Sequence, residues 1–187
     1  MEPLDSREDR AILHSRPVPA QVNIDLLLEW INICKEHHTL QLKGTVEEHA
    51  MRPNVSLFAV DGSKMCITQL PDLGQYAALS YVWGPSGRQL KWTADRLRTA
   101  GGLNRHWQDV PTTISDAITL CQSLRIPYLW VDALCIPQDD EKLKAQFISE
   151  MDRIYGNSFL TIVAPMGKDS SPVSVPTLAK CSSLKRR

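Results

Sequence analysis

The 187-residue sequence lacks three features that mark specialised classes of protein. It has no net charge, because 21 lysines and arginines balance 21 acidic residues, so nothing draws the whole chain to nucleic acid or anionic lipid. It has no run of about 18 uncharged apolar residues, which excludes a membrane-spanning helix. No apolar segment follows a basic start at the N-terminus, so we expect no secretory signal and predict a cytoplasmic protein.

Cysteine is sparse and scattered, with five residues that lie far apart and form no CxxC pair. This usage is typical of reduced thiols in an intracellular protein. The one local cluster of metal-ligating types is Cys34 with His37 and His38, and it lacks the further ligands that a zinc site needs. We therefore expect no bound metal, and the two histidines fit better as charges near a helix C-terminus.

Glycine-rich phosphate-binding motifs are also missing, since neither GxGxxG nor GxxxxGK[ST] occurs. Aromatic residues make up 6% of the chain and do not alternate with basic residues, which argues against a surface for RNA. The sequence therefore predicts no resident cofactor and no nucleic-acid partner.

What the composition does favour is one packed domain with tails, because 43% of the residues are hydrophobic and 22% are charged. The expected parts are a flexible tail at 1–22, a helix and hairpin extension at 23–75, a core at 76–165 and a basic disordered tail at 166–187. A nuclear-localisation patch is the minor alternative for the last of these.

Local patterns predict the elements of the extension. Apolar residues from Ile24 to Cys34 fall at helical spacing, after Asn23 and Asp25, either of which can cap a helix. Two strand-like runs, 55–60 and 65–70, flank Asp61 and Gly62, which is a turn signal. We expect a helix followed by a β-hairpin.

The core alternates between strands and helices. Apolar runs predict strands at 76–83, 128–134 and 159–164, and amphipathic spacing predicts helices at 114–124 and 140–155. Such alternation is typical of an α/β fold with a parallel central sheet and right-handed crossovers. The irregular stretch 86–110 is long for a compact domain, which is often a sign of function.

Polar residues gather where the first two core strands end. Because ligands of parallel sheets bind beyond the carboxyl ends of the strands, neighbouring strands would share one crevice there. The candidate residues are Ser80, Tyr81, Trp83, Gly84, Asp132, Cys135, Gln138 and Asp139.

Asp132 interrupts an apolar run, so its carboxylate must be paired or hydrogen-bonded. A structural network with Ser80 or the turn at Gly84 is one interpretation, and an acid–base or ribose-binding carboxylate is the other. Cys135 is a weaker candidate for a nucleophile, because the acidic residues at 139–141 oppose a thiolate.

Four blocks of this core closely resemble the HET (heterokaryon incompatibility) domain of filamentous fungi. The blocks are YAALSYVWG (76–84), VPTTISDAI (110–118), IPYLWVDALCIPQDD (126–140) and MDRIYGNSFLTIVA (151–164). The resemblance covers about half the chain and implies non-self recognition between fused hyphae, with programmed cell death as the outcome. It also implies a likeness to TIR domains, which have a flavodoxin-like fold.

The resemblance leaves two functions open. One is a signalling module that acts through protein partners or self-association, without chemistry of its own. The other is a TIR-like NAD glycohydrolase, with NAD as substrate, in which a carboxylate stabilises the ribosyl cation. The family often has Glu or Gln four residues before Met151, where this chain has Phe147, so Asp132, Glu150 and Glu141 are the catalytic candidates.

The family usually continues well beyond the strand at 159–164. The sequence is thus expected to be either a truncated family member or a stand-alone copy of the first part of the domain. A missing edge would expose strand or apolar surface and favour partner binding.

Overall fold

A computed structural model describes residues 22–39, 53–82, 101–138, 140–164 and 177–181. The predicted flexible N-terminal tail and basic C-terminal tail therefore lie almost wholly outside the described residues, as do the site candidates Trp83, Gly84 and Asp139.

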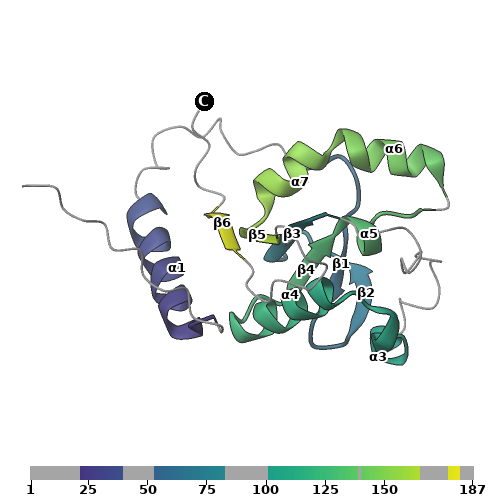
Figure 1. The fold of residues 1–187 in the computed structure, drawn as a ribbon. Coiled ribbons are helices and arrows are strands. Elements are labelled where there is room, and N and C mark those ends of the chain that lie inside the picture. The colour runs from purple at the N-terminus through teal and green to yellow at the C-terminus, as the bar shows by residue number, and fades with distance from the viewer. Residues whose placement is uncertain (1–21, 40–52, 83–100, 139, 165–176, 182–187) are drawn as a thin grey trace, which may run out of the picture.

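The described elements alternate strands and helices through the core (Figure 1). They are α1 (Ile24–Thr39), β1 (Phe58–Asp61), β2 (Cys66–Gln69), β3 (Tyr76–Tyr81), α3 (Gly102–Arg105), the 3-10 helix η2 (Trp107–Asp109), α4 (Thr112–Ser123), β4 (Tyr128–Val131), α5 (Asp132–Cys135), α6 (Glu141–Ser149), α7 (Met151–Asn157), β5 (Leu160–Ala164) and β6 (Thr177–Cys181).

One six-stranded sheet, in the order β2-β1-β4-β3-β5-β6, forms the middle layer. Its three inner strands β4, β3 and β5 are parallel, which confirms the predicted parallel centre. The outer pairs are antiparallel, so the sheet as a whole is mixed. Helix α4 lies on one side of the sheet and α6 with α7 lies on the other, which gives three layers (Figure 1).

The predicted helix and hairpin are both present, but the hairpin is not an appendage. Strand β1 pairs with β4, so β1 and β2 extend the same sheet and share its core. Helix α1 begins after Asn23, whose side-chain oxygen accepts a hydrogen bond from Leu26 N at 3.0 Å and so acts as the N-cap.

A buried carboxylate organises the hairpin turn. Asp61 accepts hydrogen bonds from Ser63 N at 2.9 Å, Ser63 Oγ at 2.6 Å and Lys64 N at 3.0 Å. Burial by itself would raise the pKa of Asp61, but these hydrogen bonds outweigh it and lower the pKa. The charged form of Asp61 therefore stabilises the folded state.

Replacing Asp61 by alanine should cost about 2 kcal/mol at neutral pH, since three donors lose their acceptor. Because the folded-state pKa lies below 3.8, this stabilisation is present above that pH and is lost as the pH falls through the folded-state pKa. Urea unfolding at several pH values should show Asp61→Ala and wild type converging in acid. The matched control is Asp72→Ala, an exposed carboxyl that should behave as wild type; a constant gap across pH would contradict the assignment.

The stretch 101–109, predicted to be irregular, is largely helical. Gly101, in the left-handed conformation at φ 72°, donates its N–H to Lys64 O at 2.8 Å, and Leu103 N donates to Met65 O at 2.9 Å. Leu103 is completely buried. The sequence did not predict α3 because this helix is short and its hydrogen bonds go to the hairpin turn, which lies far away in sequence.

The predicted strand at 128–134 is too long. Strand β4 ends at Val131, and the chain turns at once into the short helix α5, whose first residue is Asp132. The Asp132 carboxylate accepts the N–H of Ala133 at 2.7 Å. The run of apolar residues continues through this turn because Ala133, Leu134 and Cys135 are all buried, which is why periodicity alone did not detect the strand end.

The helix predicted at 140–155 is divided at Glu150, which ends α6 and precedes α7. Glu150 N bonds to Phe147 O, three residues back, and the side chain of Glu150 turns towards another segment of the chain. The predicted core stripe holds at Phe147 and Ile154, which are 1% and 0% exposed.

Helix α4 ends in a Schellman motif centred on Arg125. Ile126 N donates to Cys121 O at 2.9 Å and Arg125 N donates to Gln122 O at 3.1 Å, which places Arg125 at φ 58°. A side chain in this left-handed region costs about 1 kcal/mol.

Arg125→Gly should therefore raise the free energy of unfolding by about 1 kcal/mol, because glycine adopts this conformation without a steric penalty. Chemical denaturation would measure the difference. Arg125→Ala is the control, since it keeps the Cβ and should change stability little. Equal stability of the glycine and alanine variants would show that the motif is not strained.

Candidate functional site

The first two core strands end side by side, as predicted. Strands β3 and β4 are neighbours in parallel register, with Leu79 opposite Val131. Ser80 and Tyr81 complete β3, and Asp132 directly follows β4. Ser80, Tyr81 and Asp132 thus lie at the carboxyl end of the parallel strands, where the candidate site was predicted.

The charge of Asp132 affects Tyr81 at this end of the parallel strands. Burial raises the pKa of the Tyr81 phenol, and the negative charge of Asp132 raises it further. Both side chains are half-buried. The Tyr81 hydroxyl therefore stays protonated at neutral pH.

Tyr155 of α7 belongs to the same group, although the sequence did not single it out. Its hydroxyl donates to Leu79 O at 3.2 Å, and its ring meets the Trp130 ring edge-on, with centroids 5.5 Å apart. Burial raises the pKa of Tyr155 to about 12, and the charge of Asp132 raises it as well. A hydrogen bond with Ser80 lowers this pKa but does not cancel the rise. The signal was present in the helical spacing of Met151 and Tyr155, which puts both on one face.

Trp130 lies beneath this group in β4 and is completely buried. Within the described part of the chain, its indole Nε1 has no hydrogen-bond partner. A buried donor without an acceptor is rare in proteins and costs stability.

Cys135 lies in the core, four residues after the end of β4. Its sulfur accepts a hydrogen bond from Val131 N at 3.3 Å, and the residue has no exposed surface. Burial raises the Cys135 pKa to about 12, and the charge of Asp132 contributes in the same direction. The thiol is therefore protonated at neutral pH, which does not suit a nucleophile.

Gln138 and Glu141 follow α5 along the chain. Gln138 is half-buried and donates its side-chain amide to Ile136 O at 3.0 Å. Glu141 is exposed at the start of α6, and its carboxylate lies 3.6 Å from the Lys144 ammonium. Both side chains thus have local partners.

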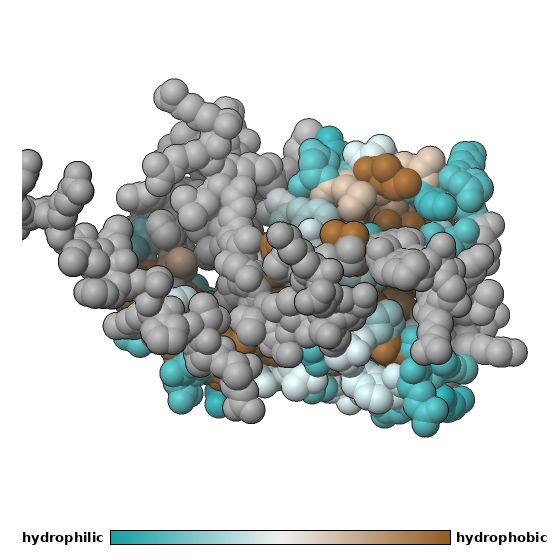
Figure 2. All heavy atoms as spheres, viewed as in Figure 1, coloured by the Kyte–Doolittle hydropathy of each residue, from teal (hydrophilic) through white to brown (hydrophobic). Residues whose placement is uncertain are grey.

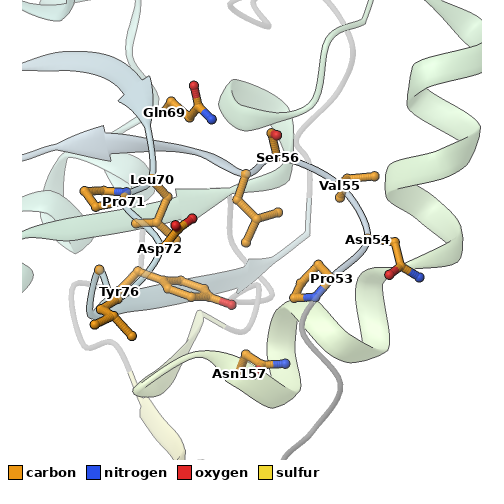
Figure 3. Close-up of a pocket in the computed structure, with 13 residues that line it drawn as sticks. Pro53, Asn54, Val55, Ser56, Gln69, Leu70, Pro71, Asp72, Tyr76 and Asn157 are labelled. Atoms are coloured by element: carbon orange, nitrogen blue, oxygen red, sulfur yellow. The ribbon is translucent and has the colours of Figure 1, made fainter.

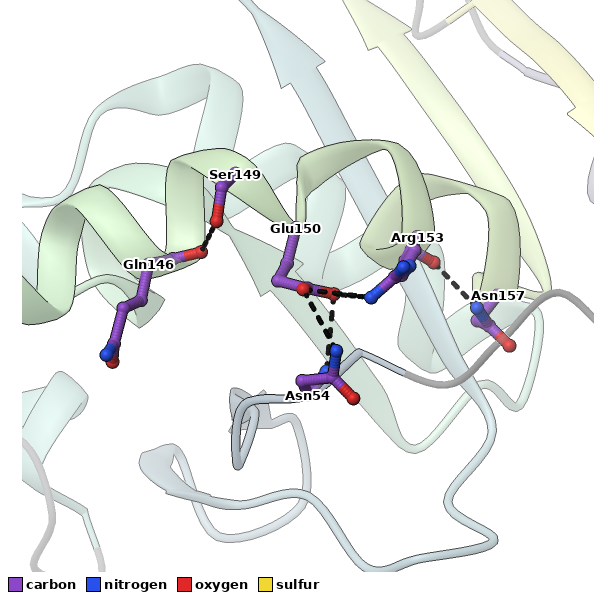
Figure 4. Close-up of polar contacts among 6 residues, drawn as sticks. All are labelled: Asn54, Gln146, Ser149, Glu150, Arg153 and Asn157. Atoms are coloured by element: carbon purple, nitrogen blue, oxygen red, sulfur yellow. Dashed lines mark hydrogen bonds and ion pairs between the residues drawn. The ribbon is translucent and has the colours of Figure 1, made fainter.

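Glu150 faces a different part of the molecule (Figure 4). Its carboxylate accepts bonds from Asn54 N at 3.2 Å, from the Asn54 side-chain amide at 3.3 Å and from Arg153 at 2.9 Å. Desolvation raises the Glu150 pKa, and the bonds from Asn54 and Arg153 outweigh it, so the pKa is lowered. Glu150 therefore ties the segment before β1 to the α6–α7 junction.

A hollow lies at the opposite, amino end of the parallel strands (Figure 3). It has a volume of about 550 Å³ and is open to solvent. Pro53 and Asn54 lie on one side of it, Pro71 and Asp72 on the other, with Tyr76 between them (Figure 3). The Tyr76 hydroxyl donates to Ile154 O at 2.5 Å, so this tyrosine is already engaged by α7.

The described residues lack a metal-ligand cluster and a membrane-spanning helix. They contain no group of three or more His, Cys, Asp or Glu side chains placed to hold a metal ion. No helix among them is long and apolar enough to cross a membrane.

Comparison with known proteins identifies the family of this α/β domain. Residues 76–186 match the family described as heterokaryon incompatibility protein (HET), and the chain belongs to that family. Over 110 residues, 52% of the chain, it is 29% identical to the Neurospora crassa protein named heterokaryon incompatibility protein 6, OR allele. The match spans only 15% of that relative's length. No solved structure matches the chain.

Proposed function

We propose that this chain is a signalling module of fungal non-self recognition, which triggers cell death through association with other proteins or with its own copies. The observation that carries the proposal is its membership of the HET family together with a match to a relative named for heterokaryon incompatibility. We place it in the cytoplasm, where fused hyphae mix their contents.

The strand order supports a TIR-like or flavodoxin-like interpretation of the core. The first, second and third parallel strands, β3, β4 and β5, lie in the spatial order second, first, third. Flavodoxin-like sheets begin in this order, and their ligand crevice lies beyond the first and third strands, where the topology reverses. In this chain that place is Tyr81, opposite Ala164.

The absence of a family-position carboxylate favours signalling without chemistry. Phe147 stands where the family often has Glu or Gln, and it is 1% exposed, with its side chain in the core. Glu150 is the acidic residue nearest to Phe147 in the sequence, and its carboxylate accepts hydrogen bonds from Asn54 and Arg153.

One observation favours the NAD glycohydrolase as a second candidate. The charge of Asp132 acts on the protonated phenols of Tyr81 and Tyr155 at the carboxyl end of the sheet. A carboxylate there could stabilise an oxocarbenium-like cation, with the neutral Tyr81 phenol as a donor to a ribose hydroxyl.

Induced expression in a filamentous fungus, combined with an NAD assay on the purified chain, tests both candidates. We expect growth arrest on induction and no nicotinamide release at micromolar protein. Nicotinamide release above that of heat-denatured protein would establish the second candidate instead. Normal growth at a protein level equal to that of a toxic HET protein would contradict the signalling proposal.

A further inference from the structure

Large exposed apolar side chains gather on α1, outside the region that matches the HET family. Trp30 is 54% exposed and Ile33 is 45% exposed, and Leu26, one turn before Trp30, is half-buried. Residues at this spacing form one continuous stripe on a helix. Among the described residues, the other exposed large hydrophobic side chains lie away from α1, as Ile148 does on α6.

This stripe, Leu26–Trp30–Ile33, is separate from the stripe that holds α1 to the protein. Leu27 is 8% exposed, and Ile24, Leu28 and Ile31 pack against the core beside it. Most of the apolar surface of the helix is therefore used on one side, and the Trp30 side remains open to solvent. An exposed apolar patch on a folded domain marks a place of interaction.

The open stripe has an acidic border. Asp25, Glu29 and Glu36 are exposed, and their helical positions place them in one row beside Ile33 and Leu26. The basic Lys35 does not balance this row, because its ammonium lies 5.0 Å from the centre of the Phe159 ring, on the side of α1 that faces the domain. Elsewhere on the molecule, hydrophilic residues gather at the far end of α6 and near α3 (Figure 2).

We propose that this face of α1 binds a basic amphipathic helix of another protein. The stripe offers a ridge at i, i+4 and i+7, which fits the groove of a second helix. The acidic row beside it attracts lysines and arginines along the flank of that helix and repels acidic ones. A second copy of α1 would bring the same acidic row against itself, so charge disfavours self-pairing through this face.

The test uses the whole chain and a defined probe. The probe is a fluorescent peptide of about 18 residues, or five helical turns, made of leucine and lysine at amphipathic spacing. Fluorescence anisotropy should give micromolar binding that weakens as salt is added. The same peptide with glutamate in place of lysine should not bind.

Two variants locate the binding face. Trp30→Ala combined with Ile33→Ala should weaken binding about tenfold or more, since exposed aromatic anchors dominate such interfaces. Glu29→Lys combined with Glu36→Lys should weaken it and reverse the salt effect. The matched control is Ile148→Ala, which removes an equally exposed side chain on α6 and should leave the affinity unchanged.

Circular dichroism would verify that each variant is folded, as expected for side chains about half exposed. Equal binding of the basic and acidic peptides, or an unaffected Trp30/Ile33 double variant, would overturn the proposal. Sedimentation gives a further test. If the wild-type chain forms dimers that the double variant does not form, and the peptide does not bind, the proposal is wrong, because this face of α1 would then bind a second copy of the chain. The proposal does not depend on the cell-death function, so growth assays cannot decide it.

Discussion

Phe147→Glu should unfold the protein rather than create an active site. The substitution restores a carboxylate at the position where the family often has one, but the Phe147 side chain is 1% exposed and packs in the core. An unpaired carboxylate there costs about 4 kcal/mol or more, in addition to the lost burial of the ring. That loss is comparable with the entire stability of many domains. Thermal unfolding followed by circular dichroism should show no cooperative unfolding transition for this variant.

Phe147→Leu is the control for this experiment. Leucine keeps the site apolar and smaller, so the variant should remain folded, with a loss of about 1–2 kcal/mol. A folded Phe147→Glu variant that releases nicotinamide from NAD would contradict the burial argument and would favour the enzymatic candidate. The pair of variants thus separates the size of the side chain from its charge.

Asp132→Asn should abolish growth arrest on induced expression while leaving the fold intact. Asparagine keeps the side-chain oxygen that accepts Ala133 N, so the turn from β4 into α5 survives with a stability change under about 1 kcal/mol. The lost group is the negative charge that acts on Tyr81 and Tyr155. If the chain cleaves NAD, the same variant should lower the rate about 100-fold or more.

Asp152→Asn is the matched control, because it removes an exposed carboxylate from the neighbouring helix α7 and should remain fully toxic. Colony counts on inducing medium and melting curves of the purified variants would measure the two effects. A toxic, stable Asp132→Asn protein would show that Asp132 is only a structural residue of the β4–α5 turn.

Long, strongly patterned segments of the fold were predictable, and their ends were not. The apolar runs at 76–83 and 128–134 predicted β3 and β4, but β4 ends three residues early because Asp132 starts a helical turn. The spacing of Leu143 and Phe147 predicted a helix, but not its division at Glu150, whose side chain accepts hydrogen bonds from Asn54 far away in sequence. Boundaries of this kind are fixed by tertiary partners.

The candidate site shows the same division. Placing Ser80 and Asp132 at neighbouring strand ends followed from the parallel-sheet rule, and the pairing of β3 with β4 confirms that they are adjacent strands. The spacing of Met151 and Tyr155 puts both on one face of α7, but only the packing of that helix on the sheet brings the Tyr155 hydroxyl to Leu79 O. The predicted roles of Asp132, Glu141 and Glu150 stay predictions.

The sequence by itself determined the family, the parallel α/β core and the residues at the strand ends, because hydrophobic periodicity and local motifs are properties of neighbouring residues. Only the tertiary structure decided that the hairpin joins the sheet, that Glu150 holds Asn54, and that Cys135 is buried while Trp30 is exposed. These outcomes depend on which surfaces meet when distant segments pack, and burial, charge and hydrogen bonding at those contacts cannot be computed from local spacing.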